Sequence, residues 1–122
     1  MKISGLAPIE SKFADIIWAG APMSSGEVVR QAAQELDWKR TTTYTVLKRL
    51  CDRGLFENRG GTVHALISRQ EFYAMQSERF VEESFQGSLP AFLAAFSTRR
   101  KLTPQELEEL EAVIGSMRGA RE

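Results

Sequence analysis

The fold of this chain is decided by residues 38–54, which read WKRTTTYTVLKRLCDRG. Wound as a helix at about 100° per residue, the stretch has one inward face, made of Thr43, Val46, Leu47 and Leu50. The opposite face carries hydroxyls and cations, with Thr41, Thr45 and Lys48 at its centre and Tyr44 and Arg49 on its flanks. Gly54 suits the left-handed position after the last turn, and Thr41 or Thr42 is expected to cap the first turn. The stretch therefore predicts a helix with one face for a core and another that could read DNA.

The charges of the chain are unevenly spread, although their sum is zero. Residues 39–69 carry seven cations and two anions, whereas residues 1–38, 70–98 and 102–122 are each acidic. The basic block coincides with the helix above and the segment after it, which is the electrostatic pattern of a nucleic-acid-binding face. A solvated polar face is the alternative that charge alone leaves open.

Length and composition indicate an intracellular globular protein. The 122 residues, 43% of them hydrophobic, suffice for one ordinary domain without disulfide bonds. The single cysteine, Cys51, falls near the core edge of the helix above, where a small packed side chain is expected. No signal peptide and no run of about 18 apolar residues occurs. We expect a cytoplasmic protein with no membrane partner.

Two helices are predicted before residue 38. Pro8 suits the first turn of a helix to about Ala19, with a buried face of Ile9, Phe13, Ile16 and Ile17. Ser24 and Glu27 have the spacing of a capping box, in which each side chain accepts from the other's backbone N–H. It opens a helix to about Leu36, whose expected buried residues are Val28, Val29, Ala32, Ala33 and Leu36. Only residues 37–40 then precede the next helix, as in a helix-turn-helix, with Trp38 filling the corner.

A small hairpin is predicted directly after Gly54. Residues 55–58 have the composition of a short strand, residues 59–61 that of a turn, and residues 62–67 that of a returning strand. Three helices followed by a hairpin is the order of a winged helix. We therefore expect a winged-helix domain over residues 1–69, in a chain that is mostly α with a small β-hairpin.

Residues 70–122 are expected to form a helical dimerisation domain. Capping boxes at Ser68–Glu71 and Thr103–Glu106 begin its first and last helices, and a short helix lies between them. These helices have more apolar surface than one chain can cover, and a twofold homodimer would bury it. The predicted dimer residues are Phe85, Leu89, Phe92, Leu93, Phe96, Leu107, Leu110, Ile114 and Met117. Packing back on the N-terminal domain is the alternative.

An ordered set of residues between about Ala7 and Met117 resembles the penicillinase-repressor family of bacterial winged-helix repressors. The set comprises Trp38, Thr42, Thr45, Arg49-Leu50, Gly54-Leu55, residues 66–72, Gly87-Ser88-Leu89 and residues 102–110. The resemblance implies a homodimer that binds a palindromic operator in double-stranded DNA and represses transcription.

The DNA-binding candidates combine the resemblance with helix geometry. By position, Thr42, Thr45 and Arg49 match recognition-helix residues of the family. The remaining candidates are assigned on geometry, and they are Lys39, Arg40, Thr41, Tyr44, Lys48 and, on the wing, Arg59. Cations would reach guanine edges or phosphates, and threonines would donate to phosphates or pack methyl groups on thymine. Tyr44 is expected to stack on the DNA backbone or to cover Trp38.

The chain departs from the family pattern in two places. The wing is shorter than usual, with Val63-His64-Ala65 in place of a tyrosine-rich strand. Ala95-Phe96 stands where the antibiotic-resistance branch has the Asn-Phe bond whose cleavage ends repression. The paired cysteines of the copper-responsive branch are absent too. Whether a protease relieves repression therefore stays open.

Other functions have weaker support in the sequence. His64 has no nucleophile beside it, the glutamates near residue 108 fit a solvated helix face, and metal-ligand spacing is absent, so neither an enzyme nor a cofactor is expected. Two alternatives remain. One is a winged-helix protein-interaction module, and the other is a ligand-sensing regulator with a pocket lined by Phe85, Phe92 and Phe96.

Overall fold

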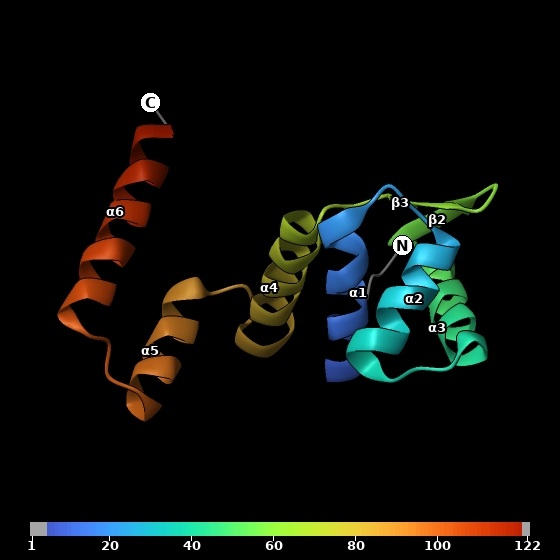
Figure 1. Cartoon of the computed structure of the whole chain (residues 1–122). Coiled ribbons are helices and arrows are strands. Elements are labelled where there is room, and N and C mark those ends of the chain that lie inside the picture. Colours follow the sequence, from blue (N-terminus) through green and yellow to red (C-terminus); the bar gives the residue numbers. More distant parts are fainter. Residues whose placement is uncertain (1–4, 121–122) are drawn as a thin grey trace. The chain divides into compact units, whose positions relative to one another are not determined.

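The computed structural model describes residues 5–120 and is mostly helical with a small sheet, which confirms the predicted fold class (Figure 1). The chain divides into two compact units, Met1–Arg79 and Phe80–Glu122. The elements, in order, are α1 (Pro8–Gly20), β1 (Met23–Ser24), α2 (Ser25–Leu36), α3 (Arg40–Asp52), β2 (Phe56–Arg59), β3 (Thr62–Ala65), α4 (Arg69–Phe85), α5 (Leu89–Arg99) and α6 (Pro104–Ala120).

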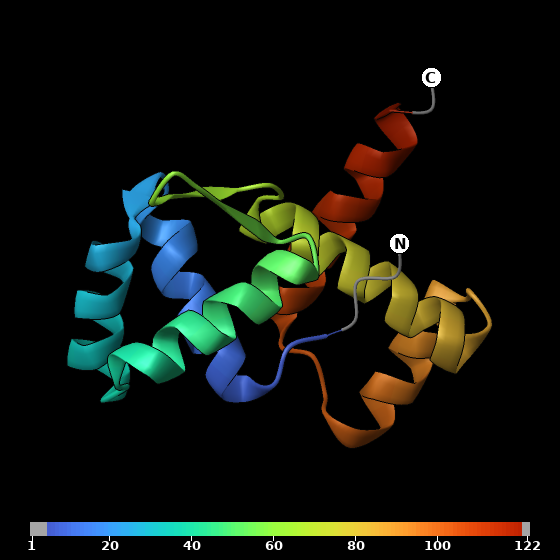
Figure 2. The ribbon, with the colours of Figure 1, turned by 90° about the vertical axis from the view of Figure 1, so that its right-hand side faces the viewer.

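The N-terminal unit has the winged-helix arrangement, in which three helices enclose one apolar core. Figure 2 shows α1, α2 and α3 grouped together, with the β2–β3 hairpin across one end of them. The core is formed chiefly by Phe13, Ala14, Ile17, Val28, Ala32, Leu47, Leu50, Leu55, Phe56 and Val63. Two predicted core residues are wrong. Ile9 is 45% exposed and Ala33 is exposed, because each lies at the edge of the apolar stripe of its helix rather than at its centre.

The sheet has one strand more than the sequence predicted. Its order is β1-β3-β2 with antiparallel neighbours, and Met23 and Ser24 of β1 pair with Val63 and Thr62 of β3. The hairpin register pairs Phe56 with Ala65 and Arg59 with Thr62. A strand of two residues is too short to show the alternation by which strands are recognised in a sequence. β1 joins the hairpin to the start of α2, since the Ser25 N–H also donates to the Gly61 carbonyl (2.8 Å).

The predicted helix caps are confirmed in two cases and corrected in two. At α4 and α6, Ser68 with Glu71 and Thr103 with Glu106 form complete capping boxes. At α2 the Ser24 hydroxyl accepts from the Glu27 N–H (3.0 Å), but the Glu27 carboxylate pairs with Arg30 instead of closing the box. At α3 neither Thr41 nor Thr42 is the cap, because the helix already begins at Arg40. The cap position is Lys39, which makes no side-chain cap bond.

Phe72, in the first turn of α4, closes the core of the N-terminal unit. Its side chain is fully buried, and its ring lies 5.6 Å from that of Trp18, centroid to centroid. Trp18 in turn packs on Phe56 (5.4 Å) and donates its indole N–H to the Ile67 carbonyl (2.9 Å). The segment that follows the hairpin is thus held against α1 by one aromatic cluster.

The C-terminal unit has apolar side chains but no core of its own. Phe80, Phe85 and Phe92 form a ring cluster with centroids 5.6–5.9 Å apart, and Phe96 extends it. Among the described side chains from residue 80 to 119, none is fully buried. Of the predicted dimer residues, Phe85, Phe92, Leu93 and Leu110 are half-buried, while the exposed ones are Leu89, Phe96, Leu107, Ile114 and Met117.

No described helix is long and apolar enough to cross a membrane.

Replacing Phe72 by alanine tests the aromatic closure of the N-terminal unit. We expect Phe72→Ala to lower the free energy of unfolding by about 3–5 kcal/mol, because a fully buried ring is lost from a packed core. The measurement is urea unfolding at one fixed protein concentration, followed by tryptophan fluorescence. The matched control is Ile9→Ala, which removes a large but exposed side chain and should cost less than about 1 kcal/mol. Equal costs for the two variants would contradict the assignment.

Candidate nucleic-acid interface

The orientation of α3 is fixed by its buried side. Thr43, Val46, Leu47 and Leu50 face the core, as the sequence predicted. The side opposite the core carries Thr41, Thr45 and Lys48, and the exposed flanks carry Arg40, Thr42 and Arg49, with Lys39 directly before the helix. Seven of the nine DNA-binding candidates are therefore exposed on α3 or directly before it. Of the other two, Tyr44 is half-buried and Arg59 is exposed at the end of β2.

The first turn of α3 collects donors for an anion. Because Lys39 makes no side-chain cap bond, the backbone N–H groups of the first turn keep no capping acceptor. The cations of Lys39 and Arg40 stand at the same end of the helix. Backbone donors, the helix dipole and two cations together favour a phosphate at this position.

The threonines differ in what they can offer. Thr45 donates its hydroxyl to the Thr41 carbonyl (2.9 Å), and Thr43 donates its own to the Lys39 carbonyl (3.1 Å). With its proton used inside the helix, Thr45 presents a methyl group and an acceptor outward, which favours methyl packing, the second of the two roles expected for the threonines, over donation. It is therefore suited to a thymine methyl or a base amino group more than to a phosphate.

The hydrogen bond and the cation–π contact of Tyr44 are with α2 and Arg40 rather than with the ring of Trp38, and its stacking on the DNA backbone stays a prediction. Its hydroxyl donates to the Ser25 hydroxyl at the start of α2 (3.2 Å), and the Arg40 guanidinium lies over its ring at 5.3 Å. Trp38 packs instead on Phe13, with ring centroids 5.0 Å apart. Tyr44 thus joins α3 to α2 and supports Arg40 by a cation–π contact.

Three of the candidate cations are paired with carboxylates. Lys48 contacts Asp52 one turn later on α3 (2.9 Å), and Arg59 contacts Glu57 on the same strand (2.7 Å). Arg49 contacts Glu10 of α1 through Nη1 (3.1 Å). The first two pairs are well exposed, so they contribute little to stability and can be exchanged for contacts with a ligand. The Arg49 pair differs because its carboxylate is mostly covered by protein.

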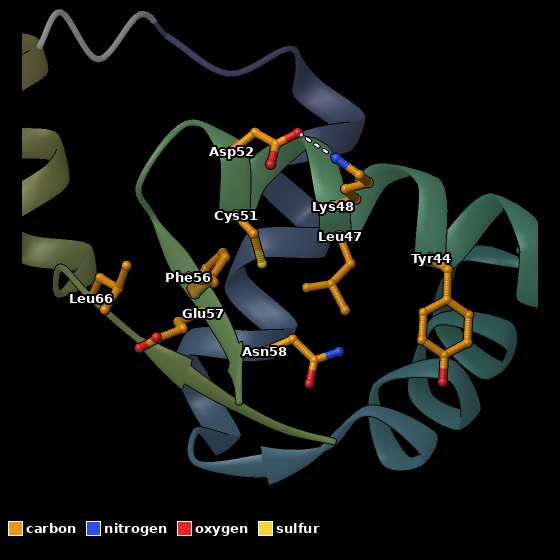
Figure 3. Close-up of a pocket in the computed structure, with 9 residues that line it drawn as sticks. All are labelled: Tyr44, Leu47, Lys48, Cys51, Asp52, Phe56, Glu57, Asn58 and Leu66. Atoms are coloured by element: carbon orange, nitrogen blue, oxygen red, sulfur yellow. Dashed lines mark hydrogen bonds and ion pairs between the residues drawn. The ribbon is translucent and has the colours of Figure 1, made fainter. Parts of the chain in front are cut away.

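A shallow hollow of about 400 Å³ lies between α3 and β2, beside the exposed face of α3 (Figure 3). Figure 3 shows the Lys48–Asp52 pair at its rim and Cys51 and Phe56 on its walls. Burial raises the pKa of the Cys51 thiol, which keeps it protonated near neutral pH. Cys51 is half-buried and serves as the small packed side chain expected from the sequence.

The Glu10 carboxylate is an important charge near this face that the sequence reasoning missed. The backbone N–H of Ala7 lowers the pKa of Glu10 most, partial burial raises it in opposition, and the Arg49 guanidinium lowers it further. Glu10 and Arg49 are 39 residues apart, and no local pattern relates them. Only the packing of α1 against α3 brings the two side chains together.

Residues 6–116 match the penicillinase repressor family. The chain belongs to this family. The Methicillin resistance regulatory protein MecI of Staphylococcus aureus is 21% identical to it over 113 residues, which are 89% of this chain and 92% of that protein. The penicillinase repressor of Bacillus licheniformis is 23% identical over 117 residues, which are 93% and 91% of the two chains.

Family membership agrees with the prediction of a transcriptional repressor rather than an enzyme. His64, the only histidine, lies half-buried on β3 opposite Glu57. Among the described residues of this chain, no group of three His, Cys, Asp or Glu side chains could hold a metal ion.

The titration of Glu10 tests the ion pair between α1 and α3. Arg49→Ala should raise the pKa of Glu10 yet leave it below its ordinary value, because the Ala7 N–H still donates to the carboxylate. The measurement is a carbon-13 NMR titration of the glutamate side chains. Arg69→Ala, which removes the partner of Asp15 on the same helix, is the control and should leave Glu10 unchanged.

The same pKa has a consequence for stability. Because the pKa of Glu10 is lower in the folded state, ionised Glu10 stabilises the fold. This contribution to the free energy of unfolding is fully present above a pH of about 4.3, which is the pKa of glutamate in the unfolded chain. The effect is lost as the pH falls through the lower, folded value. A pKa of Glu10 that does not respond to Arg49→Ala would contradict the pairing.

Proposed function

We propose that this penicillinase repressor family member binds an operator in double-stranded DNA as a homodimer and thereby represses transcription. One observation carries the proposal: because one side of α3 is buried, its cations and three of its four threonines are exposed together. A protein-interaction module has no need of such a face. The names of its relatives, a penicillinase repressor and a methicillin resistance regulatory protein, support the same function.

We propose that α3 lies in the major groove with its first turn at the phosphate backbone. Lys39, Arg40 and the N–H groups of that turn hold phosphates, while Thr41 and Thr42 bond the backbone beside them. Thr45, Lys48 and Arg49 lie further along the same face and reach base edges. The residues at the phosphates set the affinity for DNA. The shape and donors of the residues at the base edges set the sequence preference.

The wing adds a backbone contact through Arg59. The turn after β2 is formed by Gly60 and Gly61, which have φ angles of +59° and +88° that other residues rarely adopt. This tight turn leaves Arg59 at the exposed end of the hairpin, where it can leave Glu57 for a phosphate. A hairpin of two four-residue strands reaches only a short distance, so α3 carries most of the contact.

Replacing Arg49 tests the docking of α3. We expect Arg49→Ala to weaken binding to the DNA upstream of this gene by about 1–3 kcal/mol, roughly 5- to 150-fold, without unfolding the protein. Binding is measured by gel shift over a series of salt concentrations, and wild-type affinity should fall steeply with salt. The control is Arg69→Ala, another arginine paired with a carboxylate of α1 but outside α3. Equal binding by Arg49→Ala and wild type would contradict the docking.

Homodimerisation is proposed from the state of the C-terminal unit. None of its described side chains is fully buried, while Leu107, Ile114 and Met117 are 41–56% exposed along one side of α6. An open apolar hollow of about 320 Å³ lies between α5 and α6, lined by Phe92, Phe96 and Leu110 among others. We assign this surface to a second copy rather than to a small molecule, because it continues into the exposed stripe of α6.

A dimer also resolves how a short helix selects a site. One copy of α3 contacts too few base pairs to distinguish an operator from the rest of a genome. Two copies related by a twofold axis read a palindrome whose half-sites are about 10 bp apart or a multiple of that spacing.

A charge placed in the apolar stripe of α6 tests the dimer. We expect Ile114→Glu to be monomeric at concentrations where wild type is dimeric, because burying an unpaired carboxylate is unfavourable. The mass is measured by light scattering after gel filtration. Ala112→Glu places the same charge on the far side of α6 and should remain dimeric. A dimeric Ile114→Glu protein would rule out this interface.

A further inference from the structure

The Glu10 carboxylate is held at both of its oxygens. Oε1 accepts the backbone N–H of Ala7 (3.0 Å), and Oε2 accepts Nη1 of Arg49 (3.1 Å). The Glu10 side chain is only 13% exposed, whereas that of Arg49 is 55% exposed. One end of this ion pair is therefore fixed in the body of the N-terminal unit, and the other projects from the exposed face of α3.

This arrangement limits where the Arg49 guanidinium can go. An arginine side chain on a helix surface samples many rotamers and loses that freedom when it binds a base. Through Nη1, Glu10 already removes part of that freedom. Among the described residues the Arg49 side chain has no second hydrogen-bonding partner, so Nε and Nη2 keep donors for a ligand.

We propose that Glu10 is a positioning residue that determines DNA specificity, by holding Arg49 so that its remaining donors meet one base edge. The inference rests on the proposed function, since it requires α3 to contact DNA. Glu10 itself touches no base in this proposal and acts through Arg49 alone.

The sign of the charge separates specificity from affinity. A carboxylate close to the DNA-binding face repels phosphates, so Glu10 lowers the affinity for DNA of any sequence. Its contribution to a chosen site comes from geometry, because a held guanidinium discriminates between base edges and a freely rotating one mainly finds phosphates. Removing the charge should therefore have opposite effects on the two kinds of DNA.

Glu10→Gln tests this proposal while keeping the size of the side chain and an acceptor for the Ala7 N–H. The probes are a duplex selected by the wild-type protein from a randomised pool and an unrelated duplex of equal length. Specificity is measured as the dissociation constant for the unrelated duplex divided by that for the selected duplex, at one salt concentration. We expect Glu10→Gln to lower this ratio roughly tenfold and to bind the unrelated duplex as tightly as wild type or more tightly.

Two comparisons distinguish positioning from a purely structural role. Glu10→Gln introduced into Arg49→Ala should cause no further loss of specificity, since the residue that it positions is gone. Asp15 lies on α1, as Glu10 does, and pairs with Arg69 of α4 (2.8 Å). Asp15→Asn breaks this pair and should leave the ratio unchanged. An unchanged ratio in Glu10→Gln, or an equal loss with and without Arg49, would overturn the proposal.

The design also covers failure to fold and failure of the proposed function. If Glu10→Gln does not fold, Glu10→Asp is measured instead, because it keeps the charge but shortens the side chain. Its specificity ratio should also fall below that of wild type. A ratio equal to that of wild type would overturn the proposal. If Arg49→Ala weakens binding while Glu10→Gln keeps the ratio, only the positioning role fails. If wild type selects no duplex, the DNA-binding proposal itself fails, and the role of Glu10 fails with it.

Discussion

The burial of Leu47 and Leu50 beneath α3 is the constraint on which the rest of the N-terminal unit depends. Both side chains are almost completely covered, together with Phe13 of α1 and Val28 of α2. Turning α3 about its axis would expose them, at a cost of about 1.5–3 kcal/mol for each large side chain. The core therefore sets the direction in which Thr45, Lys48 and Arg49 point. The proposed DNA-reading face is a consequence of packing on the opposite side of the helix.

The C-terminal unit follows a different physical rule. Its helices are defined locally, by the hydroxyl caps of Ser88 and Thr103 and by the aromatic contacts around Phe92, and no described side chain of residues 80–119 is fully buried. Local signals of this kind specify helices but supply little hydrophobic stabilisation. A second copy would supply it, so folding of this half and assembly would be coupled.

Electrostatics on the proposed DNA-binding face is a balance rather than a simple positive patch. Asp52, Glu57 and Glu10 each pair with a candidate cation, and the chain as a whole carries no net charge. Weak nonspecific attraction to DNA suits a repressor, because such a protein must dissociate from the many genomic sites that are not its operator. The exposed pairs at Lys48 and Arg59 can open toward phosphates, whereas the covered carboxylate of Glu10 restricts the movement of the Arg49 side chain.

The sequence by itself determined the helices, their order and the two sides of α3, because caps, glycines and apolar spacing act within a few residues along the chain. It predicted the hairpin at Gly60-Gly61 for the same reason. Tertiary structure alone decided the features that depend on contacts between distant segments. These are the two-residue strand β1, the exposure of Ile9, the contact of Tyr44 with Ser25 and the pairing of Glu10 with Arg49. These features depend on which elements meet and at which register, and no pattern in a single segment encodes a partner tens of residues away.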